Sequence, residues 1–422
     1  MSHSSTVMCI KFSPDGNVLA STGGDKMVYL YDIVNGTVVS QINHHSSYVG
    51  TCSFSRNGKF LATGSNDKQL VLWKLSSNDH TSFDSDSNTC SKTAHIHAGE
   101  AQESLYVRLE NTNVEQTPEI ENSHASILSE KDDVSLFRKI PSAHTSDIND
   151  LVFISNQRVV SVSSDKTIKL WSTDLNEDHP LKIIGTHRHP MYSLCCNGKV
   201  ASLLATSALD GSIALWNSQT FEVVLAPFKL SKLGIRVCRS SNDGKKLILA
   251  GDDDGAYIWN IESGICEREL FKLGHSNTVF MACFLTDTGS LAATGCNDGY
   301  LKIWNVDMEQ VVTSVEEEAH DLGVVCGDVK PKPSDASDNN HSILATGGSD
   351  GLIKIWKISI DAESIGHCEY IQQLVGHGST VMCVSFSPKT GKFLASTSGD
   401  KTVRLWNSES YLCLRVLEGI LF

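Results

Sequence analysis

One Asp, five residues and one Trp form a pattern that recurs along this chain of 422 residues. Five copies are closely alike: "SSDKTIKLW" (163–171), "LDGSIALW" (209–216), "NDGYLKIW" (297–304), "SDGLIKIW" (349–356) and "GDKTVRLW" (399–406). All seven Trp residues close such a segment, and Tyr31 stands in the Trp position of an eighth, "GGDKMVYLYD" (23–32). Successive copies lie 42 to 52 residues apart, except for 98 residues between Trp73 and Trp171. A repeat of this period indicates radially or linearly stacked units, so the architecture follows from it.

Each unit reads as four short β-strands. Most units begin with a His and an apolar strand, and a second strand such as "KFLATGS" (59–65) follows. The Asp turn and the alternating strand that ends in Trp come next, and then a fourth strand such as "LCLRVLEG" (412–419). Alternation of period two with Gly, Asn and Asp at the turns is typical of strands. Four antiparallel strands repeated radially predict a β-propeller, which leaves only short protected sheet edges.

With its repeated His, turn Asp and Trp, the chain resembles the WD-repeat propeller family over nearly its whole length outside residues 76–132. The resemblance implies that a His, a Ser or Thr, the turn Asp and the Trp form a buried hydrogen-bonded set in each blade, because buried polar groups must pair with one another. The residues that match are His144, Ser161, Asp165 and Trp171; His187, Thr206, Asp210 and Trp216; His275, Thr294, Asp298 and Trp304; His320, Thr346, Asp350 and Trp356; and His377, Ser396, Asp400 and Trp406.

The unit at 234–260 departs from this pattern. It has no leading His, and Leu249 stands where the hydroxyl is expected. Asp253 has the usual spacing to Trp259, whereas Asp254 with the following Gly resembles the turn sequence better. We expect this blade to be held by packing alone and to be locally weaker.

The long interval contains an acidic segment over residues 76–132. It has 11 Asp or Glu against 3 Lys or Arg, a net charge of −8 out of −14 for the chain. With scattered apolar residues and no periodicity, it predicts a disordered insertion within blade 2. The expected organisation is residues 1–75 for blade 1 and three strands of blade 2, the insertion at 76–132, and residues 133–422 for the rest. Eight complete four-stranded blades are the preferred count, with seven as the alternative, and blades 1 and 8 would meet without exchanging a strand.

Composition limits the classes of partner and chemistry. The net charge of −14 argues against a broad surface for nucleic acid. The 13 Cys include no CxxC pair, and those that recur on strands read as small buried residues, so neither metal nor cofactor is expected. "AHIH" (94–97) is only a weak metal signal. Neither a signal peptide nor a run of about 20 apolar residues is seen, which predicts a cytoplasmic protein, with the nucleus as an alternative and without membrane partners.

Catalysis is not expected, because a His and Asp set repeated in every unit serves structure, whereas a catalytic set is needed once. Binding of other proteins remains, through loops on a rigid scaffold. In the resembled family, contact residues flank the first apolar residue of each unit, three and five places after the His. Carried over, the expected top-face residues are Met8, Tyr48, Asp147, Asn149, Tyr192, Leu209, Arg236, Phe280 and Met382.

From about residue 140 onward, the chain resembles more narrowly the WD-repeat proteins that also carry a SAM domain and a U-box. "EEAHDLGVVCGDV" (317–329) and "GIRVCRSSNDG" (234–244) carry this likeness. It implies a propeller that holds the substrate of a ubiquitin ligase, although no SAM domain or U-box is found in the 422 residues. The alternatives are a structural subunit that binds through blade rims and the acidic insertion, or a propeller enzyme with a unique polar cluster in its channel.

Overall fold

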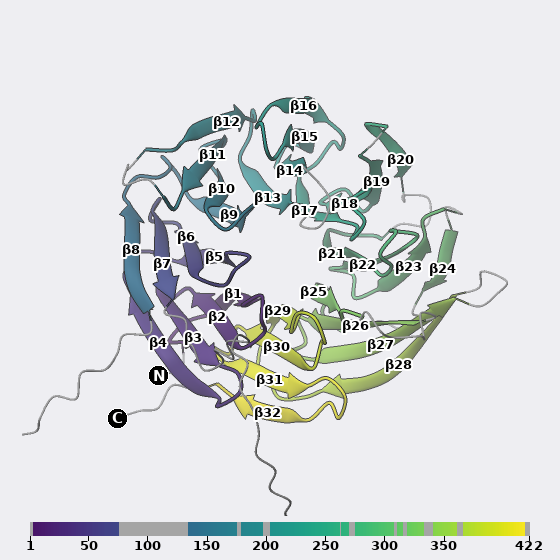
Figure 1. Ribbon diagram of the computed structural model, residues 1–422. Helices are drawn as coiled ribbons and strands as arrows, with labels where there is room; N and C mark the ends of the chain where they lie inside the picture. The colour runs from purple at the N-terminus through teal and green to yellow at the C-terminus, as the bar shows by residue number, and fades with distance from the viewer. Residues whose placement is uncertain are drawn as a thin grey trace, which may run out of the picture. The chain divides into compact units, whose positions relative to one another are not determined.

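Eight antiparallel sheets of four strands each stand around a common centre (Figure 1). The structure is a computed structural model that describes residues 3–75, 134–174, 179–196, 203–261, 263–269, 275–307, 310–314, 319–332, 341–360 and 366–417. Within these ranges there is no helix, and every sheet consists of four strands that are consecutive in sequence. The all-β propeller with eight four-stranded blades is thereby confirmed, and the seven-blade alternative is wrong.

The first two strands of each blade lie nearest the centre. The innermost strands are β1 (Val7–Phe12), β5 (Val49–Phe54), β9 (Ile148–Phe153), β13 (Met191–Cys196), β17 (Ile235–Ser240), β21 (Val279–Phe284), β25 (Val324–Val329) and β29 (Val381–Phe386). The second strands are β2 (Val18–Gly23), β6 (Phe60–Ser65), β10 (Arg158–Ser163), β14 (Leu203–Ala208), β18 (Lys246–Gly251), β22 (Leu291–Cys296), β26 (His341–Gly348) and β30 (Phe393–Ser398).

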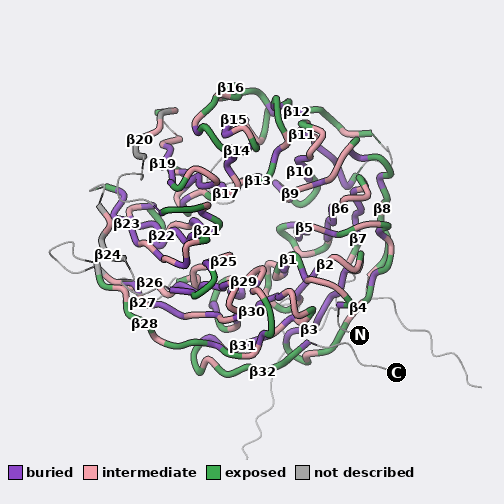
Figure 2. The backbone as a smooth tube through the Cα atoms, turned by 180° about the vertical axis from the view of Figure 1, so that it is seen from behind, coloured by how far each residue is buried: buried purple, intermediate pink, exposed green. Residues whose placement is uncertain are grey.

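The other two strands complete each blade toward the rim. The third strands are β3 (Met27–Asp32), β7 (Leu70–Leu75), β11 (Thr167–Ser172), β15 (Ser212–Asn217), β19 (Ala256–Asn260), β23 (Leu301–Asn305), β27 (Ile353–Ile360) and β31 (Val403–Asn407). The outermost are β4 (Thr37–Asn43), β8 (Val134–Ile140), β12 (Lys182–Thr186), β16 (Val223–Lys229), β20 (Ile265–Glu269), β24 (Gln310–Ser314), β28 (Gly366–Leu374) and β32 (Cys413–Val416). Exposed residues gather on these outer strands, and buried residues on the strands between centre and rim (Figure 2).

The core lies between the blades. In each third strand, side chains alternate between the two faces of the sheet because the side-chain period of a strand is two. Trp171 packs against Leu70 and Leu72 of the preceding blade, whereas Leu170 of the same strand packs with Trp216 of the following blade. Each interblade cluster therefore combines the Trp or Tyr near the end of a third strand in one blade with aliphatic side chains of its neighbour, so no cluster forms within a single blade.

Among the described residues, side-chain packing joins blades 1 and 8 and closes the ring. Val7, Ile10 and Tyr31 of blade 1 form one buried cluster with Val403 and Leu405 of blade 8. The sheets β1–β4 and β29–β32 share no strand, as expected for blades that meet without exchange. Side-chain contact therefore holds this seam between the first and last blades.

Blade 2 is completed after the long interval. β8 pairs antiparallel with β7, with Leu136 opposite Trp73. The expected insertion at 76–132, with its "AHIH" pair, lies outside the described residues. No helix in the described part of the chain is long and apolar enough to cross a membrane.

Candidate functional site

Blade 3 shows how the repeated polar residues are used. The Trp171 indole N–H donates to the Ser161 hydroxyl at 2.8 Å, and Ser161 lies 2.7 Å from Nε2 of His144. Nδ1 of His144 lies 2.8 Å from the Asp165 carboxylate. These contacts form a series of hydrogen bonds in which the Ser161 hydroxyl donates to Nε2 of His144, and the Nδ1–H of His144 donates to the Asp165 carboxylate. Each buried group thus has a partner, which is what burial of polar groups requires.

The same chain of contacts occurs in three more blades. His45, Thr63, Asp67 and Trp73 form it in blade 2; His320, Thr346, Asp350 and Trp356 in blade 7; and His377, Ser396, Asp400 and Trp406 in blade 8. In blade 1 the Ser21 hydroxyl lies 2.7 Å from His3 Nε2, and His3 Nδ1 lies 2.9 Å from Asp25. These residues are committed to the blades and are not free to act on a ligand.

Blade 4 differs from the expected set. Asp210 does not contact His187 directly; Nδ1 of His187 lies 2.9 Å from the Ser212 hydroxyl, which donates to Asp210 at 2.6 Å. The other half is as expected, because Thr206 contacts His187 Nε2 and accepts from Trp216. A hydroxyl placed two residues after the Asp has therefore entered the chain as an extra link.

The expectation that blade 5 is held by packing alone is wrong. The hydroxyls of Ser231 and Tyr257 both donate to Asp253 Oδ2, so Ser231 takes the place of the absent His. Asp253 is also the turn residue, because the residue after it, Asp254, has a φ of 63°, in the left-handed region that Lys or Gly occupies after the turn Asp in the other blades. Trp259 Nε1 is buried without a partner among the described residues, which follows from Leu249 in the hydroxyl position.

Blade stability should fall in acid. Burial lowers the pKa of His187 to about 4, and although burial acts to raise the pKa of Asp67, its hydrogen bond and charge interaction with His45 bring it down to about 2. Both pKa values lie below those of the unfolded chain, so the unfolded state binds more protons in acid. We expect the free energy of unfolding to fall from pH 6.5 to pH 4 through His187, and from pH 4 to pH 2 through Asp67. Urea unfolding at a series of pH values measures this fall, and a flat profile between pH 6.5 and pH 4 would contradict it.

The nine expected top-face residues come from seven blades and share one end of the ring. Eight lie at or next to the start of an innermost strand, and Leu209 precedes a turn Asp. The Leu209 N–H donates to the Pro190 carbonyl just before β13, so the two places meet in blade 4. We call this end the mouth face. Met8, Tyr48, Tyr192, Leu209 and Phe280 are exposed there. The rest of the nine, Asp147, Asn149, Arg236 and Met382, are half-buried.

Tyr192 and Arg236 form the best-defined feature of the mouth face. The Arg236 guanidinium lies 5.3 Å from the centroid of the Tyr192 ring, and its Nε donates to Asp252 at 2.6 Å. Asp252 holds the Arg236 guanidinium in place, and the guanidinium in turn holds the Tyr192 ring. The two side chains, from blades 5 and 4, are therefore preorganised at the mouth face. Aromatic and Arg side chains held in this way are the residue types that dominate binding energy at protein interfaces.

Asn149 has a structural duty as well. Its side-chain N–H groups donate to the Ser164 hydroxyl at 2.9 Å and to the Met191 carbonyl at 2.6 Å. It therefore links blade 3 to blade 4 and is less available to a partner than the sequence analysis expected.

Sequence reasoning missed two exposed apolar residues of the mouth face. Leu233 and Leu322 are 51% and 64% exposed, and each lies just before an innermost strand. Leu322 follows His320 by two places instead of three or five, and Leu233 belongs to the blade that lacks its His. A search for apolar residues between the leading position and the first strand would have found both.

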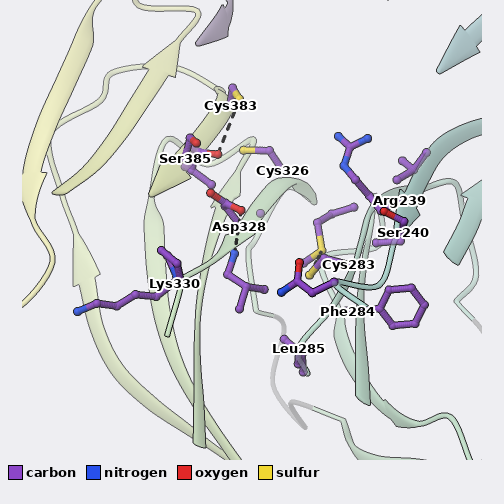
Figure 3. A pocket seen from close by; sticks show the side chains of 18 of the residues that line it. Arg239, Ser240, Cys283, Phe284, Leu285, Cys326, Asp328, Lys330, Cys383 and Ser385 are labelled. Carbon is purple, nitrogen blue, oxygen red and sulfur yellow. Dashed lines mark hydrogen bonds between the residues drawn. The ribbon is translucent and has the colours of Figure 1, made fainter. Parts of the chain in front are cut away.

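A cavity of about 790 Å³ lies at the centre, lined by β1, β17, β21, β25 and β29. Arg236, Phe280 and Met382 of the mouth face are part of its lining. Figure 3 shows Arg239 on one side of the cavity and Asp328 on the other. The mouth face therefore continues inward into a polar channel.

Charged residues on the innermost strands were also missed. They are Lys11, Asp150, Arg239 and Asp328. Burial raises the pKa of both Asp residues, against the hydrogen bonds that they accept from backbone N–H groups. Asp150 accepts from Leu194 N–H and Asp328 from Phe386 N–H, at 3.0 and 2.7 Å. Each carboxylate thus ties its strand to the next blade, and a charged residue within an otherwise apolar strand was the available signal.

Thiols recur on the same strands. Cys9, Cys52, Cys195, Cys238, Cys283, Cys326 and Cys383 lie on seven of the eight innermost strands, and no described cysteine is in a disulfide. Cys52 and Cys238 are buried in interblade clusters, as expected for small apolar residues. A hydrogen bond from the adjoining thiol of Cys52 lowers the pKa of Cys9.

The family model described as "WD domain, G-beta repeat" matches residues 1–32, 36–74, 136–172, 266–305, 318–357 and 368–407. Residues 173–265, which the model does not match, hold blade 4 and the first three strands of blade 5, where the hydrogen-bonded set is altered. The chain is 28% identical to nuclear distribution protein PAC1 of Arthroderma otae (strain ATCC MYA-4605 / CBS 113480), over 65% of this chain and 62% of that protein.

Two further likenesses concern a longer relative and the fold. The chain is 29% identical to WD repeat, SAM and U-box domain-containing protein 1 of Danio rerio, over 67% of this chain and 57% of that protein. The match thus spans less than two thirds of the length of this relative, as it does for the PAC1 protein. The crystal structure of the computationally designed Ika8 protein superposes with a TM-score of 0.65 over 96% of this chain and 97% of the design, at 19% identity. This last likeness concerns the fold alone.

Proposed function

Because the chain belongs to the WD-repeat family of β-propellers, we propose that it is a non-catalytic scaffold that binds another protein through its mouth face. The observation that carries this proposal is the apolar surface around the cavity entrance. Its exposed residues are Met8, Tyr48, Tyr192, Leu209, Leu233, Phe280 and Leu322. Exposed apolar side chains gathered on one face, and rimmed by polar residues, are typical of protein interaction sites.

The partition of residue types supports a binding role. The His and turn Asp side chains of blades 1, 2, 3, 7 and 8 are tied to each other within their blades, whereas the mouth residues differ from blade to blade. A rigid ring with variable residues on one face can recognise a partner with little ordering of its own side chains. The net charge of −14 supports a protein partner and argues against nucleic acid.

In its sharper form, the proposal is that the bound protein is the substrate of a ubiquitin ligase. The similarity to the U-box relative supports this form, and so does the lack of the usual leading His in blade 5, which the sequence analysis linked to that group. The chain would supply recognition, and a U-box would supply the contact with the conjugating enzyme. A cytoplasmic or nuclear location fits this role.

A structural subunit that binds through the blade rims is the second candidate. Exposed apolar residues on the outermost strands favour it: Val38, Leu136, Phe137, Ile183, Val223, Val224, Tyr370, Leu414 and Val416. They are spread over six blades around the ring, so a partner that used them would have to wrap the rim.

Partner capture should separate the two surfaces. We expect Tyr192→Ala with Arg236→Ala to weaken capture of partner proteins by about 100-fold, because loss of two interface anchors typically costs several kcal/mol. The matched control is Val223→Ser with Val224→Ser on the rim, which should leave capture unchanged. Quantitative pull-down from cell extract, followed by titration of the captured protein, gives both values. Full retention by the mouth variant, or loss by the rim variant, would reverse the assignment.

The ubiquitin-ligase form has its own readout. When the chain is joined to a U-box domain, the captured protein should be ubiquitinated by activating and conjugating enzymes, and the mouth variant should abolish this transfer. If the partner protein were captured but no ubiquitin were transferred to it, the ubiquitin-ligase form of the proposal would be rejected and the scaffold role would remain.

A further inference from the structure

One position of the second strand holds Ser in three blades and Gly or Ala in four, but Cys in blade 6. The residue two places before the turn Asp is Ser65 in blade 2, Ser163 in blade 3 and Ser398 in blade 8, but Cys296 in blade 6. The Ser side chains accept from the turn Asp N–H and donate to a backbone carbonyl. Cys296 keeps both contacts, with Asn277 O at 3.0 Å and Asp298 N–H at 3.4 Å from its sulfur. A thiol therefore stands where three other blades have a hydroxyl.

The His–Asp contact is altered in the same blade. Nδ1 lies 2.8 to 3.0 Å from a turn carboxylate oxygen in blades 1, 2, 3, 7 and 8. In blade 6, His275 Nδ1 and Asp298 Oδ1 are 3.4 Å apart and make no hydrogen bond. His275 is 7% exposed, and its Nδ1 has no hydrogen-bond partner among the described residues. An unpaired buried nitrogen is costly, so its environment calls for an explanation.

Three different donor atoms surround this place. Nδ1 of His275, Sγ of Cys296 and a carboxylate oxygen of Asp298 all lie within 4.8 Å of one another. In a tetrahedral zinc site, with metal–ligand lengths of about 2.0–2.3 Å, donor atoms lie about 3.3–3.6 Å apart. The His275–Asp298 separation of 3.4 Å already has this length, and it is too long for a strong hydrogen bond.

We propose that His275, Cys296 and Asp298 bind a zinc-class divalent ion at the mouth-side end of blade 6. The set contains one imidazole, one thiolate and one carboxylate, the three ligand types that zinc takes in proteins. Three protein ligands leave the fourth tetrahedral position to water. Binding displaces the thiol proton to solvent, so the thiolate and carboxylate balance the two charges of the ion.

Neighbouring groups are placed to support these ligands. Nε2 of His275 lies 2.9 Å from the Thr294 hydroxyl, to which it can donate while Nδ1 presents its lone pair. The backbone N–H of Ser276 donates to Asp298 Oδ2 at 3.0 Å, and Asp298 N–H points at the sulfur. The sequence predicts no metal and places His275 and Asp298 in a structural set. The Cys at position 296, where blades 2, 3 and 8 have Ser, distinguishes blade 6 from that prediction.

Cobalt binding tests the site. The full chain, freed of metal by chelator and kept reduced, is titrated with Co²⁺, which reports a thiolate ligand by a charge-transfer band. We expect one equivalent of Co²⁺ to give this band and Zn²⁺ to displace it. Cys296→Ser recreates the residue of blades 2, 3 and 8, so it should fold, and it should weaken Co²⁺ binding at least 100-fold, since loss of groups that merely support ligands already costs about 10–100-fold.

Two other thiols provide controls. Cys413→Ser removes an exposed thiol, and Cys90→Ser removes the thiol nearest to "AHIH" in sequence; both variants should retain the band. Zn²⁺ should also raise the melting temperature of the wild type and leave that of Cys296→Ser unchanged, a readout that does not depend on colour. Absence of the band in the wild type, or its persistence in Cys296→Ser with full intensity, would overturn the proposal.

Discussion

Leu405→Ala is expected to lower the free energy of unfolding by about 3 to 5 kcal/mol and to open the ring at one place. Leu405 is 1% exposed, and it packs with Val7, Ile10 and Tyr31 across the seam between blades 1 and 8. Removal of a buried Leu side chain costs its transfer free energy and leaves a cavity. No shared strand holds this seam, so the loss falls on the contact that closes the ring.

Leu215→Ala is the matched control, because Leu215 occupies the same place of its strand, one residue before Trp216, and packs against blade 5. A similar loss of stability is expected from it, measured by urea unfolding. Hydrogen exchange should separate the two variants: amides of β1 and β29 should exchange faster only in Leu405→Ala. Equal exchange of these amides in both variants would show that the seam is no weaker than other blade boundaries.

Ser161→Ala is expected to lower the free energy of unfolding by about 2 to 4 kcal/mol. The Ser161 hydroxyl accepts from Trp171 and contacts His144, and all three side chains are buried. Its removal leaves two polar nitrogens without a partner, and each unsatisfied buried group costs about 1–3 kcal/mol. Chemical denaturation of the wild type and the variant measures the difference.

Ser207→Ala is a control that removes the same atom from a similar strand. Ser207 lies next to Thr206 on β14, is fully buried, and its hydroxyl has no partner among the described residues. Its loss should change stability little, or raise it slightly, because no hydrogen bond is broken. A large loss in Ser207→Ala, or a small one in Ser161→Ala, would mean that the hydroxyl contacts do not hold the blade.

The fold was predictable because the signal is repeated. Each copy of the Asp turn and Trp strand is a weak indication alone, but eight copies at a regular spacing leave few architectures. Because each of the eight repeats supplies four strands of its own, the pattern also predicted eight blades and a seam without exchange. The number of blades and the absence of a shared strand both follow from the number and order of the strands along the chain, which the repeat pattern shows directly.

The local polar contacts were less predictable because they depend on which residue fills a fixed place. Ser231 replaces a His in blade 5 at the same distance of 22 residues before the turn Asp as His3 and His45, but a Ser at that distance is no signal by itself. Ser212 enters blade 4 as an added link. The position of the turn Asp in the repeat predicts that its carboxylate needs a polar partner. Which side chain reaches that carboxylate depends on the path of the backbone around it. The sequence predicted part of the mouth face, because Tyr192 and Phe280 lie five places after the leading His of their blades. It did not predict Leu233 and Leu322, which do not follow this spacing.

Construction of every sheet from four consecutive strands makes the blade an exchangeable unit. Since no strand is shared, a duplicated segment of about 45 residues adds a whole sheet, and no existing sheet has to be rebuilt. The near-copies "HSSTVMCIKFSPDGNVLAS" (3–21) and "HGSTVMCVSFSPKTGKFLAS" (377–396) lie beside each other across the seam, as a tandem pair would after the ring has closed. A ring built in this way can change its circumference one blade at a time, and with it the width of its channel and the set of side chains that surround the mouth.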